Sequence, residues 1–190
     1  MASTYTANGI NRLYSSLPTV GSGVTGLNIG NLPANCTIRI VFMYRPHQQS
    51  NLYIRGYENP ARTILATFRG SNTNDHISGS TLYNRSGYFQ GTTYFYPAYY
   101  YQDYDTNDAP VMLDMTLHNY SDETNHGPTL EAYTQYAYTG GSLPMITHSQ
   151  AEINLSNSTS TIDNMTFWLN NSAYYHYASY NVWVEGEHLN

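Results

Sequence analysis

The chain has 190 residues, of which 11% are charged and 21 are tyrosine, and its formal net charge is −6. Disordered chains are rich in charge and poor in aromatic residues, so this composition predicts a folded chain whose length suits one domain. The negative charge argues against nucleic-acid binding, which requires cations to neutralise phosphates. No apolar run is long enough to span a membrane, so we expect no membrane insertion.

The charges are unevenly distributed along the chain. Its seven basic residues are all arginines before residue 90, where only Glu58 and Asp75 oppose them, which gives that half a net charge of +5. The remainder has eleven acidic residues and no basic one, which gives −11. The halves either form separate faces that attract neighbouring copies head to tail, or interleave their strands and mix the charge.

Residues 1–22 differ from the rest because they are mostly small and polar. Such a segment buries little by itself, so it is either a loose tail or an arm that becomes ordered against a neighbour. We favour an arm, because apolar side chains are available to anchor it, namely Ile10, Leu13, Tyr14 and Leu17.

Residues 23–190 show apolar side chains at every second position and no helical spacing. The first clear case is Ile38, Ile40, Phe42 and Tyr44, which we expect on one buried face of a strand. Later faces contain Val111, Leu113, Met115 and Leu117, then Met165, Phe167 and Leu169, then Val182 and Val184. Shorter strand candidates are Val24–Ile29, Leu52–Tyr57, Thr63–Phe68, Tyr88–Phe95, Thr129–Tyr138 and Ile153–Leu155.

Segments rich in Gly, Pro and Asn separate these candidates and predict turns, one of them at Ser71–Asp75. Many short strands without helices indicate an all-β fold. We predict a single antiparallel β-sandwich or jelly roll of about nine strands over residues 23–190, preceded by the extended N-terminal arm.

The order of the strands carries a resemblance. The pattern opens with a small-residue strand that leads into a proline and then into a strongly β-forming stretch ending in Arg. A central strand follows later. The pattern closes with an Ile-centred strand, a Ser/Asn-rich loop and a last strand that ends in Gly. The corresponding residues are Val24–Ile29, Leu32–Ala34, Thr37–Arg45, Gln48–Tyr57, Val111–Tyr120, Ile162–Leu169, Asn170–Ser172 and Tyr180–Gly186.

This pattern resembles a jelly-roll domain of tailed-bacteriophage virion proteins, which occurs in short stand-alone structural proteins and at the distal ends of tail fibres. The segment Gly56–Asn59 departs from the Asn-Gly-Asp-like turn usual there, and Tyr94–Tyr104 is more aromatic than the pattern. Together with the fold, the resemblance implies a virion surface protein. Because Met1–Ile10 has neither a basic start nor an apolar stretch typical of a signal peptide, we expect the protein to be made in the host cytoplasm. The resemblance further implies a homotrimer that contacts the major capsid protein or other virion proteins.

Two tyrosine clusters are the candidate contact sites. Tyrosine combines a large rigid ring with a polar tip, which suits protein interfaces and sugar stacking alike. We predict an interface or glycan-binding role for Tyr94, Tyr96, Tyr99, Tyr100, Tyr101, Tyr104, Tyr174, Tyr175 and Tyr177.

Other chemistry has little support in the sequence. Asp103, Asp105 and Asn107 resemble part of a calcium loop, but the turn glycine and the final glutamate are missing, so a solvated acidic loop is the better interpretation. We therefore expect no metal and no cofactor. The single cysteine, Cys36, is expected to be a small buried residue.

Three functions fit these observations. The first is a non-enzymatic capsid decoration or cement protein on the virion surface. The second is a tail-fibre or receptor-binding adhesin whose Tyr94–Tyr104 segment contacts host surface glycans. The third and weakest is a virion-borne glycan hydrolase that uses acids such as Asp103 or Glu131.

Overall fold

The computed structural model describes residues 6–7, 10–16, 24–46, 51–59, 65–78, 81–97, 110–121, 127–136, 145–156, 159–169 and 175–185. Over these ranges the chain forms twelve strands and no helix, so no helix long and apolar enough to cross a membrane occurs there. The strands are β1 (Thr6–Ala7), β2 (Ile10–Ser16), β3 (Gly26–Gly30), β4 (Thr37–Pro46), β5 (Leu52–Asn59), β6 (Thr67–Ser78), β7 (Thr81–Thr92), β8 (Val111–His118), β9 (Thr129–Tyr136), β10 (Met145–Asn154), β11 (Thr161–Leu169) and β12 (Tyr175–Glu185).

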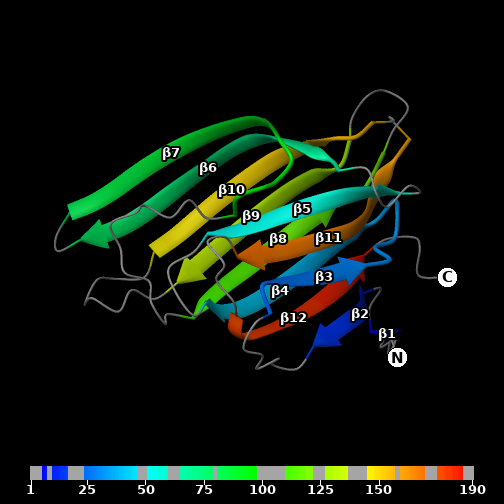
Figure 1. The fold of residues 1–190 in the computed structure, drawn as a ribbon, viewed down its shortest axis with the longest axis horizontal. Helices are drawn as coiled ribbons and strands as arrows, with labels where there is room; N and C mark the ends of the chain where they lie inside the picture. Colours follow the sequence, from blue (N-terminus) through cyan, green and yellow to red (C-terminus); the bar gives the residue numbers. More distant parts are fainter. Residues whose placement is uncertain are drawn as a thin grey trace.

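The strands form two antiparallel sheets of unequal size. The large sheet has the order β1-β2-β12-β4-β8-β9-β10-β6-β7, and the small sheet has the order β3-β11-β5. Figure 1 shows the small sheet lying in front of the large one. The prediction of an all-β antiparallel sandwich is confirmed, with twelve strands where the sequence predicted about nine.

The core lies between the two sheets and follows the predicted alternation. On β4 the side chains of Ile38, Ile40, Phe42 and Tyr44 are fully buried, and the facing positions of β8 are buried in the same way. The small sheet contributes Phe167, whose ring centroid lies 5.2 Å from that of Phe42 on the large sheet. The two hydrophobic faces therefore meet directly, as the period-two pattern requires.

The side chain of Asn119 joins the sheets at the end of β8. Its amide nitrogen donates to the carbonyl oxygens of Pro33 and Ile162, each at 2.7 Å, and its oxygen accepts from the backbone N–H of Ile162 at 2.8 Å. Asn119 is fully buried. It therefore connects the large sheet, the loop after β3 and the start of β11.

The segment predicted as an N-terminal arm contains β1 and β2. Strand β2 pairs with β12 of the same chain, and β1 pairs with β2. The two strands thereby add to the seven that run from β12 to β7, which gives a sheet of nine. Of the expected anchors, Ile10, Leu13 and Tyr14 lie on β2, and Leu17 lies outside the described residues. Their role as anchors stays a prediction.

The turn predicted at Ser71–Asp75 is wrong, because these residues lie in the middle of β6. They pair with β10 on one side and with β7 on the other. The side chain of Asn72 is buried, and the Thr73 hydroxyl donates to the carbonyl oxygen of His148 at 3.4 Å. Pairing on both edges thus overrides a local sequence typical of turns.

The two oppositely charged parts of the chain are interleaved in the large sheet. Strand β4 from the basic half lies between β8 and β12 from the acidic half, and β10 lies beside β6. Arg39 on β4 donates to both carboxylate oxygens of Asp114 on β8, at 2.9 Å and 2.5 Å. Over the described strands, the fold therefore mixes the charge within one sheet.

Candidate binding surfaces

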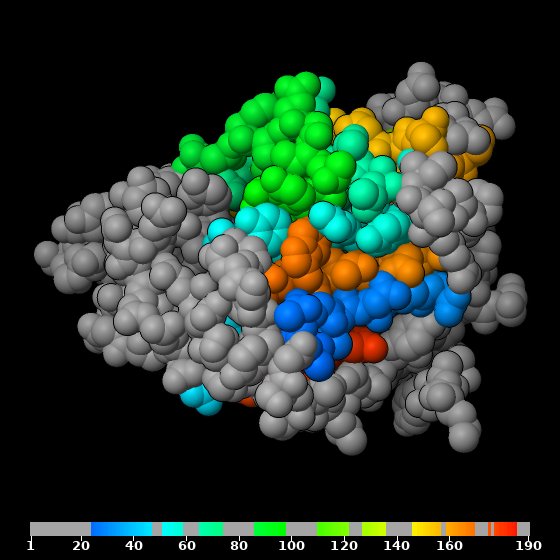
Figure 2. Space-filling view, in the orientation of Figure 1, coloured from blue at the N-terminus to red at the C-terminus, as the bar shows by residue number. Residues whose placement is uncertain are grey.

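A group of aromatic side chains covers part of the outer surface of the small sheet. This aromatic cluster consists of Tyr53 on β5, Trp168 on β11, and Tyr94 and Tyr96 in the segment after β7, all half-buried. Figure 2 shows this side of the molecule, with β5 in cyan, β11 in orange and β3 in blue as adjacent bands, and residues up to Pro97 in green beside β5.

The backbone holds the segment after β7 against β5. The N–H of Phe95 donates to the carbonyl of Ile54 at 2.8 Å, and the N–H of Ile54 donates back at 3.0 Å. Phe95 is buried in the core, so Tyr94 and Tyr96 on either side of it point outward. This bridge, rather than a full strand, places the two predicted tyrosines beside Tyr53.

The rings of the aromatic cluster contact one another. Tyr53 stacks on its cross-strand partner Trp168 with centroids 5.1 Å apart, while Tyr94 meets Tyr53 edge-on at 5.1 Å and Tyr96 at 4.8 Å. The Arg55 guanidinium lies 4.4 Å from the centroid of the Trp168 ring. Burial, followed by hydrogen bonds with Tyr94 and Tyr53, raises the pKa of Tyr96. The cluster is a surface of mutually packed aromatic rings, and the Tyr96 phenol stays neutral at neutral pH.

Only part of the predicted tyrosine set belongs to this surface. Tyr175 lies in the core, 1% exposed, with its ring edge-on to Phe42 and Tyr44, so burial removes it from any contact site. Tyr177 is half-buried on β12 in the large sheet. The other predicted residues lie outside the described ranges, namely Tyr99, Tyr100, Tyr101, Tyr104, Tyr174, Asp103, Asp105 and Asn107.

Sequence reasoning missed Tyr53, Arg55 and Trp168. The alternation of Leu52, Ile54 and Gly56 with Tyr53, Arg55 and Tyr57 carried the necessary signal, since it places the second set on the outer face of β5. What it did not contain was the pairing of Tyr53 with Trp168, which depends on the register between β5 and β11.

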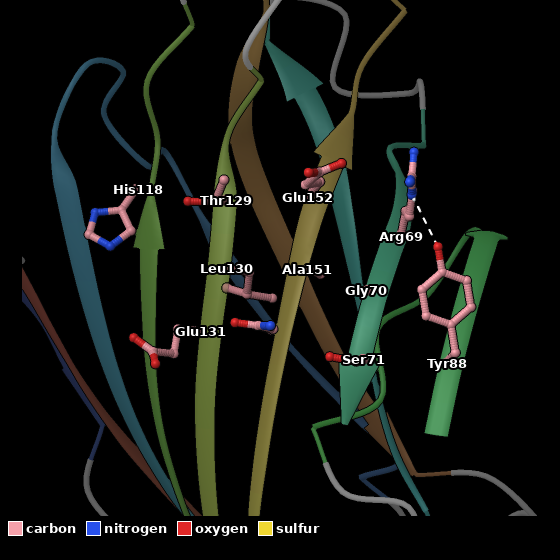
Figure 3. A pocket seen from close by; sticks show the side chains of 11 residues that line it. Arg69, Gly70, Ser71, Tyr88, His118, Thr129, Leu130, Glu131, Ala151 and Glu152 are labelled. Atoms are coloured by element: carbon pink, nitrogen blue, oxygen red, sulfur yellow. Dashed lines mark hydrogen bonds between the residues drawn. The ribbon is translucent and has the colours of Figure 1, made fainter. Parts of the chain in front are cut away.

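A second feature is a groove of about 540 Å³ on the outer surface of the large sheet, crossing β8, β9, β10, β6 and β7. Figure 3 shows Tyr88 on one side of this groove and His118 and Glu131 on the other. Arg69 donates through Nε to the Tyr88 hydroxyl at 3.2 Å. Between them lie the short side chains of Ser71 and Thr129 and the longer ones of Gln150 and Glu152.

At the edge of this groove Glu131 has two polar partners. The Tyr133 hydroxyl donates to Glu131 Oε1 at 2.9 Å, and Nε2 of His148 lies 2.9 Å from the same oxygen. The Tyr133 and His148 rings are stacked, with centroids 4.5 Å apart. The hydrogen bonds from Tyr133 and then from His148 lower the pKa of Glu131, so its carboxyl is ionised at neutral pH.

A third feature is an exposed apolar patch at the other end of the same face. It consists of Met43, Met112, Tyr133 and Ile146, whose exposed fractions are 43%, 39%, 49% and 51%. Met43 is the direct cross-strand partner of Met112, and Gln135 connects Met112 with Ile146 across β9. Six residues separate Met112 from His118 along β8, which places Met112 about 20 Å from that end of the groove. Tyr133 lies between the two features, since its hydroxyl bonds Glu131 at the groove edge.

Comparisons with protein-family models, with curated proteins and with solved structures find no match to this chain. The conclusions below therefore depend on the geometry of this molecule. Within the described residues no group of His, Cys, Asp or Glu side chains is arranged to hold a metal ion. Cys36 is buried as predicted, and burial raises the pKa of its thiol to about 11.

Proposed function

We propose that this protein is a non-enzymatic structural protein on the surface of a tailed-phage particle, where it decorates the capsid and stabilises it. The observation that carries the proposal is the apolar patch. A soluble sheet normally covers its outer face with polar side chains, and clustered exposed methionine, tyrosine and isoleucine indicate a protein partner. The strand order that resembles phage virion jelly rolls supports the choice of partner.

The mechanism requires no chemistry. The patch would be buried against major capsid subunits, with Arg39 and Asp114 beside it among the polar groups that set the register. Burying apolar area across neighbouring subunits raises the free energy needed to separate them, which opposes the internal pressure of packaged DNA. A homotrimer would apply this stabilisation at three points.

A hydrolase has less support than a binding protein. A glycosidase needs a carboxylic acid whose pKa is raised so that it can donate a proton. Glu131, the acid named for that role within the described residues, has its pKa lowered instead. Its position suits a hydrogen-bond acceptor.

The aromatic cluster favours a second candidate, a tail-fibre adhesin. Tyr94 and Tyr96 are exposed in part, and their rings are held by Tyr53 and Trp168, so a glycan would meet a preorganised aromatic surface. On this alternative the partner is a host surface glycan, and the capsid plays no part.

The test is to mix purified protein with particles of the phage that encodes it, stripped of accessory proteins, and to measure binding and heat-induced DNA release. We expect saturable binding and delayed release. A Met112→Glu/Ile146→Glu double variant should bind about 10- to 100-fold more weakly, because two charges replace buried apolar contacts. Gln90→Glu, a change at an exposed position on β7 away from the patch, should bind as the wild type.

Failure of the wild-type protein to bind these particles would overturn the capsid role. Binding of free protein to host cells, lost in a Tyr94→Ala/Tyr96→Ala variant, would then establish the adhesin. Equal binding by the double variant and the wild type would contradict the assignment of the apolar patch.

A further inference from the structure

We propose that the groove on the outer surface of the large sheet binds an uncharged oligosaccharide, with the ring of Tyr88 as its stacking platform. This site lies outside Tyr94–Tyr104 and outside the apolar patch. The inference goes beyond the capsid role and does not rest on it.

The first argument is shape. Ligand sites commonly have volumes of about 300–1,000 Å³, and the groove has about 540 Å³. Its floor includes the backbone at Gly70, which carries no side chain. Taller side chains stand on both sides in Figure 3, Tyr88 on one and His118 with Glu131 on the other. An elongated, open groove of this kind suits a chain of sugar rings.

The second argument is the aromatic ring. Tyr88 is 67% exposed, the most exposed of the large apolar side chains in the described residues. Its hydroxyl accepts a hydrogen bond from Arg69, which restricts the ring before any ligand arrives. A fixed and exposed aromatic face contacts the apolar C–H face of a sugar with little loss of side-chain entropy.

The third argument is the polar lining. Gln150 supplies both a donor and an acceptor, the carboxylates of Glu131 and Glu152 accept from hydroxyl groups, and Arg69 donates. Sugar hydroxyls donate and accept at once, so this mixture matches them. Glu131 is ionised at neutral pH because Tyr133 and His148 lower its pKa, and it serves as an acceptor without donating a proton to a glycosidic bond.

The charge of the lining selects the class of sugar. The lining carries two glutamates, Glu131 and Glu152, and one arginine, Arg69, which pairs across strands with Glu152, so carboxylates outnumber guanidinium groups. Anionic ligands such as sialylated or uronic-acid sugars, phosphates and nucleotides are repelled by such a lining. Neutral oligosaccharides remain.

The test begins with the intact protein on a printed array of neutral, amino-sugar and acidic oligosaccharides, followed by calorimetric titration of the best neutral binder. We expect binding in the neutral class and recovery of the oligosaccharide uncleaved. Tyr88→Ala should weaken binding about tenfold, which corresponds to about 1.4 kcal/mol, because the stacking ring is lost. Tyr88→Phe should retain most of the binding affinity, because it keeps the aromatic ring.

Tyr120→Ala is the matched control, because Tyr120 is 45% exposed and does not line the groove. It should bind as the wild type, as should Ile146→Glu, which separates this proposal from the capsid role. No binding of any neutral oligosaccharide at millimolar concentration would overturn the inference. Binding confined to acidic sugars, or binding that survives Tyr88→Ala and is lost with Tyr94→Ala, would overturn it equally.

Discussion

A buried amide at the end of β8 shows how one polar side chain can fix the relation of two sheets. Asn119 satisfies three backbone groups, two carbonyls and one N–H, through its side chain alone. Its own backbone N–H donates to Cys36 at 2.9 Å, and its carbonyl accepts from Asn35 at 2.8 Å. Asn35 has a positive φ of 54°, a conformation that asparagine tolerates better than most residues.

Replacing Asn119 with alanine should therefore be costly. Three buried backbone groups lose their partners, and we expect the free energy of unfolding to fall by about 3 kcal/mol. Urea denaturation followed by tryptophan fluorescence measures this loss. The exposed change Gln90→Ala should stay within about 0.5 kcal/mol of the wild type. A loss below about 1 kcal/mol for Asn119→Ala would show that water replaces the amide.

At this scale the sequence allowed only partial prediction. The burial of Ile38, Ile40, Phe42 and Tyr44 followed from alternation alone and is confirmed. The burial of Asn119 was not predicted, because nothing local marks a polar side chain whose partners lie far away in the chain. The same is true of Tyr175, whose place in a tyrosine-rich segment suggested a contact surface although its ring fills the core.

At the scale of the element, β6 depends on a close approach to β10. Gly70 pairs with Ala151, and a Cβ at Gly70 would lie 2.8 Å from the Cα of Ala151 as well as overlapping the Gln150 carbonyl. The obstacle is backbone, which cannot move aside without breaking the ladder. A side chain at this position therefore conflicts with the pairing itself.

Gly70→Ala should destabilise the protein by about 2–4 kcal/mol, in the range of strained or overpacked core changes. Thermal unfolding measured by circular dichroism would detect it, and amide exchange should accelerate first along β6 and β10. Ser71→Ala, one residue on and facing the opposite way, is the control and should leave stability almost unchanged. Equal stability of Gly70→Ala and Ser71→Ala would mean that β6 and β10 accommodate a Cβ at position 70 without a loss in the free energy of unfolding.

Element prediction succeeded where one face is apolar and failed where both faces are polar. β4 and β8 were located almost to the residue. β10 was predicted only at Ile153–Leu155 but runs from Met145 to Asn154, because its inward residues Thr147 and Ser149 carry no apolar signal. Ser149 instead donates to the carbonyl of Pro97 at 3.0 Å, a partner that no local pattern indicates.

For the whole molecule, the first two strands protect an edge. Residues Tyr180–Glu185 of β12 pair with β2, so removing β2 would leave that backbone unpaired. Exposed edges associate with other chains unless they are covered. The core residues whose burial the structure describes all lie between Ile29 and Val184.

A chain starting at Val24 should thus unfold cooperatively but associate with itself as its concentration rises. Sedimentation velocity over a concentration series measures this, and a chain lacking only residues 1–5 is the control because it retains β1 and β2. A truncated chain that remains monomeric throughout would contradict protection of the edge by β2. The groove and the apolar patch should be preserved in it.

The architecture was the most predictable level, since the fold class and the buried faces follow from period two, although about nine strands were predicted and twelve are present. The binding surfaces were not, because the groove joins residues of five strands and the aromatic cluster joins β5, β11 and the segment after β7. Register between distant strands creates both surfaces, and register is not encoded in any single segment.

The interleaved strand order also has a consequence for synthesis on the ribosome. Strands β3 and β5 are both paired by β11, and β4 lies between β8 and β12, so the earliest strands leave the ribosome long before their partners. Asn59 pairs with Thr161, and Thr37 pairs with Glu185, so the first residue of each pair is synthesised long before its partner. Translation runs at about 5–20 residues per second, so this interval lasts seconds, during which apolar strands stay unpaired. The large sheet is completed only when β12 has been made, and a chain terminated before β11 lacks the central strand of the small sheet.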